Sequence, residues 1–252
     1  MNKPSLLAAT LCALGVALAT PAAAQVAVLE RQELRAQLTA QRYTTLAAEI
    51  GAKVSRIAVE EGGRFKAGEV VLSFDCAVQQ AALEKAQAEL NASERSLKAN
   101  IELEKLNSVG KLEIDLARAA VERNSAEVRM NRAVLGKCTV RAPFNGRVAE
   151  QLVREQQYVQ PGEPLLDILD DSTLELDFIV PSRWLTWLKI GGAFSVAIDE
   201  TGKTYPARFK RIGARVDPVS QSVKVSGVID GKFPELIAGM SGRVDVTPPA
   251  NQ

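Results

Sequence analysis

Two stretches of sequence that repeat each other decide the fold: VSRIAVEEGGRFKAGEVVLSFD at Val54–Asp75 and VAEQLVREQQYVQPGEPLLDIL at Val148–Leu169. Shifted by 94 positions they align without a gap, and Gly68 then matches Gly162. Each copy alternates apolar and polar residues around a glycine-containing turn, which predicts short β-strands. Neither copy can bury its apolar face alone, so we expect the two to pair into one small β-sandwich.

A charged, alanine-rich segment separates the two copies and has almost no strand-forming character, from Ala77 to Lys137. Asn, Ser and Gly cluster near its middle, at Leu106–Leu112, which indicates a break between two helices. Two antiparallel helices of roughly 25 to 30 residues would reach about 40 Å at 1.5 Å per residue. We expect them to project from the sandwich as a coiled-coil hairpin.

The apolar rows of this segment differ between the two predicted helices. The first helix has one row at alternating steps of three and four, as a coiled-coil seam requires: Leu83, Ala86, Leu90, Ser93, Leu97 and Asn100 or Ile101. The second has two rows on nearly opposite faces, namely Leu112, Leu116, Ala119, Ala126, Met130 and Ala133, and then Ile114, Val121, Val128 and Leu135. Either both rows form one broad stripe, or the row from Ile114 to Leu135 packs on a neighbouring copy of the protein.

The two repeats resemble the biotinyl/lipoyl half-motif, G-x-V followed by a Gly-rich turn and V/F-x-x-G-E/Q-x-L. RAPFNGRV at Arg141–Val148 resembles the start of the second half in HlyD-type periplasmic adaptor proteins, also called membrane fusion proteins. A lipoyl carrier bears its modified lysine in a tight turn between the halves. Here a long insertion replaces that turn, so the adaptor is favoured over the carrier. The resemblance implies a mainly β fold, in which a split biotinyl/lipoyl-like sandwich carries the hairpin.

The part after the second repeat is similar to the β-barrel module of the same adaptors. LELDFIVP at Leu174–Pro181 alternates as a strand and stops at proline. SRWLTWLKIGG at Ser182–Gly192 predicts one short helix with Trp184, Leu185 and Leu188 turned inward. Further strand-like runs follow to L-x-x-G-M-S-G. In VDPVSQSV, Gln221 stands where the family often has arginine.

The first residues are typical of a secretory signal peptide. Lys3 precedes an apolar run at Leu6–Ala19 that is too short to cross a membrane comfortably, and we expect cleavage after Ala24. The resulting domain boundaries are 1–24 signal peptide, 25–48 N-terminal strands of the barrel or a membrane-proximal module, 49–75 first half, 76–138 hairpin, 139–170 second half, 171–246 barrel and 247–252 tail.

Cys76 and Cys138 flank the insertion at its two feet. If the helices are antiparallel and start and finish on one sandwich, the two cysteines should be near neighbours. Exported proteins occupy compartments where disulfides persist, and a bridge closing roughly 60 residues could stabilise the fold by about 4 kcal/mol. Two free thiols or a thiol redox site are the alternatives.

The composition argues against catalysis. The chain has no histidine, which excludes Ser-His-Asp and Cys-His mechanisms and histidine metal sites. Asp170–Asp171 and Glu60–Glu61 are adjacent residues at strand ends, so their side chains point to opposite faces. Gly202–Thr204 lacks the rest of a phosphate-binding motif and predicts a hairpin turn. We therefore expect no enzyme, no cofactor and no metal, and the balanced charge gives no reason to expect nucleic acid.

The resemblance also implies partners. Adaptors that dock on TolC-type outer-membrane channels have a hairpin tip similar to R-L-x-x-L-x-x-x-x-A-x-S. The leucines of this pattern match here, but its arginine, alanine and serine do not. The predicted tip contact comprises Leu103, Leu106, Gly110, Leu112, Glu113 and Leu116.

The implied function is that of a periplasmic adaptor, peripheral to the inner membrane. It would link an inner-membrane transporter of the resistance-nodulation-division (RND) type to the outer-membrane channel, as a trimer or hexamer. The alternatives are an adaptor of a type I secretion or ABC-type exporter, or a lipoyl/biotinyl-like carrier domain.

Overall fold

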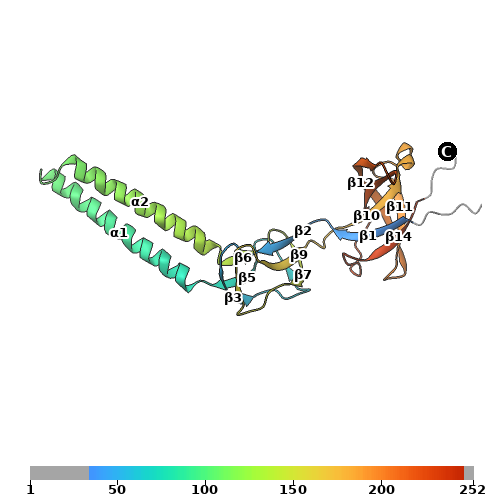
Figure 1. Ribbon diagram of the computed structural model, residues 1–252, viewed down its shortest axis with the longest axis horizontal. Coiled ribbons are helices and arrows are strands. Elements are labelled where there is room, and N and C mark those ends of the chain that lie inside the picture. Colours follow the sequence, from blue (N-terminus) through green and yellow to red (C-terminus); the bar gives the residue numbers. More distant parts are fainter. Residues whose placement is uncertain (1–33, 247–252) are drawn as a thin grey trace, which may run out of the picture. The chain divides into compact units, whose positions relative to one another are not determined.

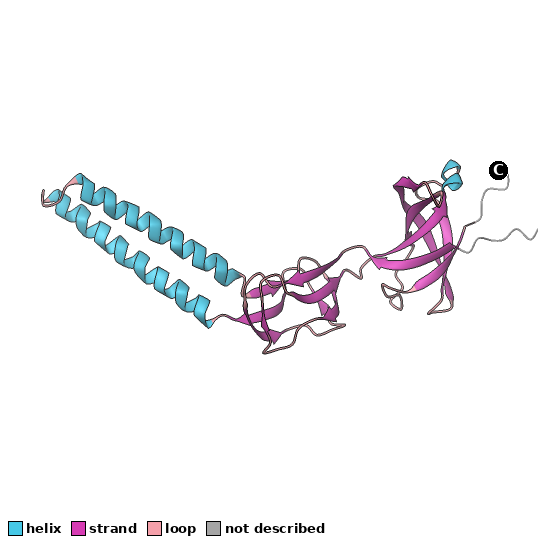
Figure 2. Cartoon of the chain, in the orientation of Figure 1, coloured by secondary structure: helices cyan, strands magenta, loops and turns pink. Residues whose placement is uncertain are grey.

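The computed structural model of the protein describes residues 34–246 (Figure 1). The predicted signal peptide, the strand-like piece at Val26–Leu29 and the tail at 247–252 lie outside these residues. The described chain forms a closed β-barrel, a pair of β-sheets and two long helices, as Figure 2 shows by colour. The predicted mainly β fold with two helices and a following barrel is thus confirmed.

The barrel has six antiparallel strands. In their order around the barrel they are β1 (Leu34–Ala40), β10 (Leu174–Pro181), β13 (Ser222–Ile229), β12 (Lys203–Asp217), β11 (Ala193–Ile198) and β14 (Ser241–Asp245). Alternate side chains point inward, and the rings of Phe178, Phe194 and Phe209 pack against one another in the core, with centroids 4.6 to 6.2 Å apart. Gly227 is required beside them, because a Cβ at this position would lie 2.5 Å from the Phe194 ring.

The residues at 25–48 were expected to join the barrel or a membrane-proximal module, and the structure describes them from residue 34 onward. β1 closes the barrel between β10 and β14. β2 (Tyr43–Ala47) instead pairs with β9 (Pro164–Leu169) outside the barrel, with Tyr43 opposite Leu169. The reason is that the first repeat begins earlier than 49, since Ala48 is a buried core residue that matches Ala142 at the same shift of 94 positions.

The two repeats interlock in a pair of four-stranded sheets. One sheet has the order β2, β9, β7 (Gly146–Gln151) and β4 (Arg64–Phe65). The other has the order β6 (Thr139–Arg141), β5 (Val70–Asp75), β3 (Ala52–Ile57) and β8 (Tyr158–Val159). Each sheet takes two of its strands from β2–β5 and two from β6–β9, and the sheets share one buried core that includes Val54, Leu72, Val148 and Leu166. The core is therefore built from both repeats, while the likeness to a lipoyl carrier stays a prediction.

The repeat is also visible in the hydrogen bonds that join the two sheets. The backbone N–H of Ile57 donates to the carboxylate of Glu155 at 2.9 Å, and the N–H of Gln151 donates to Glu61 at 3.4 Å. These two bonds exchange under the shift of 94 positions, so the unit has an approximate two-fold relation between its halves.

Two helices leave the sheets between β5 and β6, namely α1 (Ala77–Lys105) and α2 (Lys111–Gly136). They run side by side as a hairpin (Figures 1 and 2). Their lengths of 29 and 26 residues agree with the sequence prediction. Within residues 34–246, neither helix has both the length and the apolar character that a bilayer crossing needs.

Candidate functional site

The first helix packs on its partner through the row that its sequence predicts. Ala86 is buried, and Leu83, Leu90 and Leu97 are half-buried on the same side of α1. The side-chain amide of Asn124 in α2 donates to the carbonyl of Glu89 at 3.2 Å, which adds a polar link across the hairpin. The two helices thus hold each other through a narrow apolar seam.

The second helix corrects one prediction. The row proposed to pack on another copy, Ile114, Val121, Val128 and Leu135, lies on the side of α2 that faces α1. Ile114 and Val128 keep only 3% and 4% of their surface exposed. A single chain therefore already uses this row, because residues seven apart continue the seam along the helix.

The other row of α2 is the exposed one. Leu112, Leu116 and Met130 are exposed, and Ala119, Ala126 and Ala133 extend the same face. The two rows do not merge into one broad stripe, because one is covered by α1 and the other is not. The exposed row is consequently an apolar face of the hairpin that α1 does not cover.

The tip residues that the sequence singles out lie together where the helices meet. α1 ends as Ser108 N–H donates to the carbonyl of Leu103 at 2.9 Å, and Gly110 is the residue before α2. Leu106 and Leu112 are 72% and 71% exposed at this turn. Leu103, Leu116 and Glu113 are also exposed around it. The tip is an apolar surface with no cover in the single chain.

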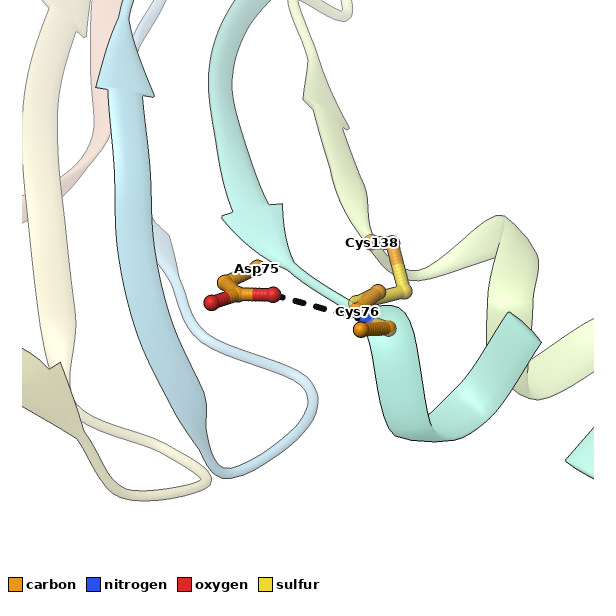
Figure 3. Close-up of a disulfide and its surroundings, with 4 residues drawn as sticks. Asp75, Cys76 and Cys138 are labelled. Atoms are coloured by element: carbon orange, nitrogen blue, oxygen red, sulfur yellow. Dashed lines mark hydrogen bonds between the residues drawn. A yellow bond between two sulfur atoms is a disulfide. The ribbon is translucent and has the colours of Figure 1, made fainter. Parts of the chain in front are cut away.

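The feet of the hairpin are joined by a disulfide between Cys76 and Cys138, whose Cα atoms lie 6.1 Å apart (Figure 3). The bond lies where β5 passes into α1 and where α2 passes into β6. Asp75, just before the N-cap residue Cys76, accepts a hydrogen bond from the N–H of Ala77 at 3.4 Å. Lys137 pairs with Glu49 at 2.6 Å, so a second link holds α2 to the sheets.

A second set of contacts links residues that lie far apart in the sequence, at Asp170, which directly follows β9. Asp170 is 2% exposed and accepts a hydrogen bond from Nε of Arg42 at 2.9 Å. The Arg42 guanidinium also lies over the Phe144 ring, 4.9 Å from its centroid. Burial by itself raises the pKa of Asp170, but hydrogen bonds from Ser172 and Arg42 outweigh burial and hold this pKa below its ordinary value.

The remaining candidate groups have structural partners. Asp171, the neighbour of Asp170, pairs with Arg64 at 2.8 Å and with Arg147 at 3.2 Å. Gly202 has a φ of 64° in the turn between β11 and β12, as a hairpin turn requires. Within residues 34–246, no three His, Cys, Asp or Glu side chains are grouped so that they could hold a metal ion. These groups form ion pairs and turns.

The short helix of the barrel differs in part from its prediction. It is a 3₁₀ helix, η1, over Ser182–Thr186. Leu188 is buried and Trp184 is half-buried against the barrel core, as expected. Leu185 was expected to point inward but is exposed. The 3₁₀ helix has three residues per turn, which rotates Leu185 away from the row that an α-helix would present.

Two curated proteins match most of the chain. A protein of Haemophilus influenzae is 29% identical over 198 residues, which are 78% of this chain and 52% of that protein. Nodulation protein NolF of Rhizobium meliloti is 25% identical over 219 residues, which are 81% of this chain and 59% of NolF. The chain thus spans between a half and three fifths of the length of these relatives. No protein-family model matches it.

Solved structures share the fold at low sequence identity. A MacA–MexA chimera that contains the Pseudomonas aeruginosa MexA α-hairpin domain has a TM-score of 0.73 at 20% identity, over 84% of this chain and 78% of the chimera. The membrane fusion protein Spr0693 of Streptococcus pneumoniae has a TM-score of 0.71 at 17% identity, over 86% of this chain and 99% of Spr0693. The chain therefore has the fold of the membrane fusion proteins, also called periplasmic adaptors, as the resemblance of its sequence motifs predicted.

Proposed function

We propose that the chain is the periplasmic adaptor subunit of a tripartite efflux pump and has no catalytic role. It would link an inner-membrane transporter of the RND type to a TolC-type outer-membrane channel for the export of small molecules. The observation that carries this proposal is the hairpin: two long helices, anchored at both feet, present an apolar tip that nothing in the single chain covers.

The arrangement supports a mechanical role. The closed barrel and the pair of interlocked sheets are stiff supports. The disulfide and the Lys137–Glu49 pair attach the feet of the hairpin to the pair of sheets. The exposed leucines of the tip would bury apolar surface on the channel, which is the main favourable contribution to such contacts. The same insertion occupies the place of the lysine-bearing turn of a carrier, so the carrier alternative has no support here.

Self-association belongs to the same proposal, but through the exposed row of α2 instead of the row from Ile114 to Leu135. The exposed α2 row from Leu112 to Ala133 would pack on the hairpin of a neighbouring copy, in a trimer or hexamer that encloses a conduit. The cleaved signal peptide would place the protein in the periplasm, at the surface of the inner membrane. An adaptor of a type I or ABC-type exporter is distinguished by which transporter is recovered with it.

Site-specific photo-crosslinking in the cells of origin tests the proposal. A crosslinker at Leu106, in the tip, should capture an outer-membrane channel. One at Val78 should not, although this residue is 79% exposed, because it lies at the other end of the hairpin. Equal products from both positions, or no membrane protein at all, would contradict the proposal. The transporter that co-purifies after crosslinking identifies the class of the pump.

A further inference from the structure

The two rims of the barrel differ in what they carry. In a closed antiparallel barrel each strand has one end at each rim, so the topology assigns every connection to a rim. The segments that join the barrel to the two sheets follow β1 and precede β10, and they leave from one rim together with the turn after β11. The other rim, which we call the distal rim, is formed by the connection 182–192 and by residues 215–222 at the β12–β13 turn.

These two segments of the distal rim touch each other. The N–H of Ser182, at the start of η1, donates to the carbonyl of Gln221 at 2.8 Å. Figure 2 shows η1 in cyan at this end of the barrel. Because the segments are joined, their exposed side chains form one surface.

That surface is apolar at its most exposed points. Val219, in the turn, is 93% exposed, and Ile190, after η1, is 67% exposed. Leu185 and Val216, in the same two segments, are also exposed, whereas the connections of the opposite rim contain a single exposed large hydrophobic residue, Ile237. The tryptophans at positions 184 and 187, the only ones in the chain, contact each other with ring centroids 5.1 Å apart and planes tilted by 41°, half-buried against the barrel core.

Unpaired basic groups surround these apolar side chains. Within residues 34–246 the side chains of Arg183, Lys189 and Arg215 form no ion pair. Two acidic residues lie at the same rim. Asp217 accepts hydrogen bonds from the N–H groups of Val219 and Ser220 in its own turn, both at 2.9 Å, and Asp245 is exposed at the end of β14. On the opposite rim, the β11–β12 and β13–β14 connections carry the four carboxylates of Asp199, Glu200, Asp230 and Glu235. Lys203 and Lys232 also lie on the opposite rim, but the carboxylates there outnumber them, whereas basic groups outnumber acidic ones on the distal rim.

We propose that the distal rim is a membrane-surface site that binds the headgroup region of an anionic lipid bilayer. Basic groups attract the negative leaflet, and protruding aliphatic side chains beside tryptophan favour the boundary between headgroups and acyl chains. The exposed apolar side chains come from two connections of the rim and have unpaired basic groups beside them, a combination that suits the headgroup boundary of a fluid bilayer. An acidic protein partner is the competing occupant. The site adds direct lipid contact to the proposed adaptor function and does not depend on it.

The test uses the purified mature chain and lipid vesicles without any transporter. Vesicles of phosphatidylcholine mixed with phosphatidylglycerol should bind the protein in a flotation assay, and vesicles of phosphatidylcholine alone should bind it far less. Added salt should weaken the binding, because it screens the charges. Since both tryptophans lie at the rim, their fluorescence should shift to shorter wavelength and should be quenched by brominated acyl chains.

Matched variants connect the binding to the rim. The double variant Arg183→Gln/Arg215→Gln should bind anionic vesicles more weakly than the wild type, by a factor of about ten or more. Val219→Asn should reduce the tryptophan shift. On the opposite rim, Lys203→Gln/Lys232→Gln and Ile237→Asn should leave binding unchanged. The proposal is overturned if the wild type does not float with anionic vesicles, if both sets of variants lose binding equally, or if the rim variants bind as well as the wild type. Circular dichroism confirms that each variant is folded.

Discussion

Arg42 and Asp170 join the two segments that connect the barrel with the sheets. Arg42 follows β1 and Asp170 follows β9, and the side-chain bond from Arg42 Nε to the carboxylate is 2.9 Å long. The backbone adds a second link, since the N–H of Asp170 donates to the carbonyl of Arg42 at 2.8 Å. Both connections are thus fixed to each other at one point.

Asp170→Asn should lower the free energy of unfolding by about 2 kcal/mol, because a buried charge-assisted hydrogen bond is lost while Arg42 keeps its charge. Arg35→Gln is the control, since it removes the exposed Arg35–Asp199 pair of 3.2 Å and should cost less than about 1 kcal/mol. Urea unfolding measures both. Equal losses in the two variants would contradict a special role for Asp170.

The stability contributed by Asp170 should depend on pH. Its pKa is lowered in the folded state, so the folded chain holds this proton less tightly than the unfolded chain does. The contribution is complete above the unfolded pKa of about 4 and disappears as the pH falls through the lower folded value. The stability difference between wild type and Asp170→Asn should therefore shrink below about pH 4. A difference that is constant down to about pH 2 would show that the carboxylate charge is not involved.

Removal of the Cys76–Cys138 bond should lower the unfolding free energy by about 4 kcal/mol on the chain-entropy model, because the two residues are 62 positions apart. Cys76→Ala/Cys138→Ala should still fold, since the β5–β6 ladder and the Lys137–Glu49 pair remain. The denaturant midpoint of the wild type should fall to that of the variant when a reductant is added. An unchanged midpoint would mean that the bond does not constrain the unfolded chain.

The carboxylates that the repeat relates should contribute unequally. Glu155 accepts the N–H of Ile57 at 2.9 Å, whereas Glu61 accepts the N–H of Gln151 at 3.4 Å. Glu155→Ala should cost about 1 kcal/mol and Glu61→Ala less than about 0.5 kcal/mol, because the longer bond is weaker. Thermal unfolding of the two variants provides the comparison, and a larger loss for Glu61→Ala would be the contrary result.

The sequence predicted those features that follow from local periodicity. The shift of 94 positions aligns Gly68 with Gly162, and both have positive φ in equivalent turns. It also aligns Gly62 with Gln156, which has a φ of 67° although it is not glycine. The turn geometry is therefore the same in both halves, and Gln156 adopts a positive φ that residues other than glycine normally avoid.

The features that the sequence did not predict are those for which two packing arrangements fit the local pattern equally well. Both rows of α2 have helical spacing, and only the position of α1 decides that the row with Ile114 is covered and the row with Leu116 is exposed. The position of β2 is a similar case. Its strand pattern would fit the barrel or the sheets, and in the structure it pairs with β9. The links of Arg42 with Asp170 and of Lys137 with Glu49 join residues over 80 positions apart, for which no local pattern exists.

Substitutions at Val128 and Met130 compare the covered and the exposed face of α2. Val128 is 4% exposed against α1, so Val128→Ala should lower the unfolding free energy of the single chain by about 2 kcal/mol through the cavity it leaves. Met130 is 55% exposed, and Met130→Ala should change this stability by less than about 0.5 kcal/mol. Urea unfolding at low protein concentration measures the single chain.

The order of effects should reverse for self-association. Met130→Ala and Leu116→Ala remove apolar surface that a neighbouring copy would cover, so they should weaken assembly while monomer stability is kept. Cysteines placed at Leu116 and Met130 should form bonds between chains under assembling conditions, whereas a cysteine at Val121 should not, because α1 already covers that side. Bonds between chains from Val121 would mean that the hairpin opens on assembly and exchanges its seam, since that residue is reachable by another copy only after the two helices separate.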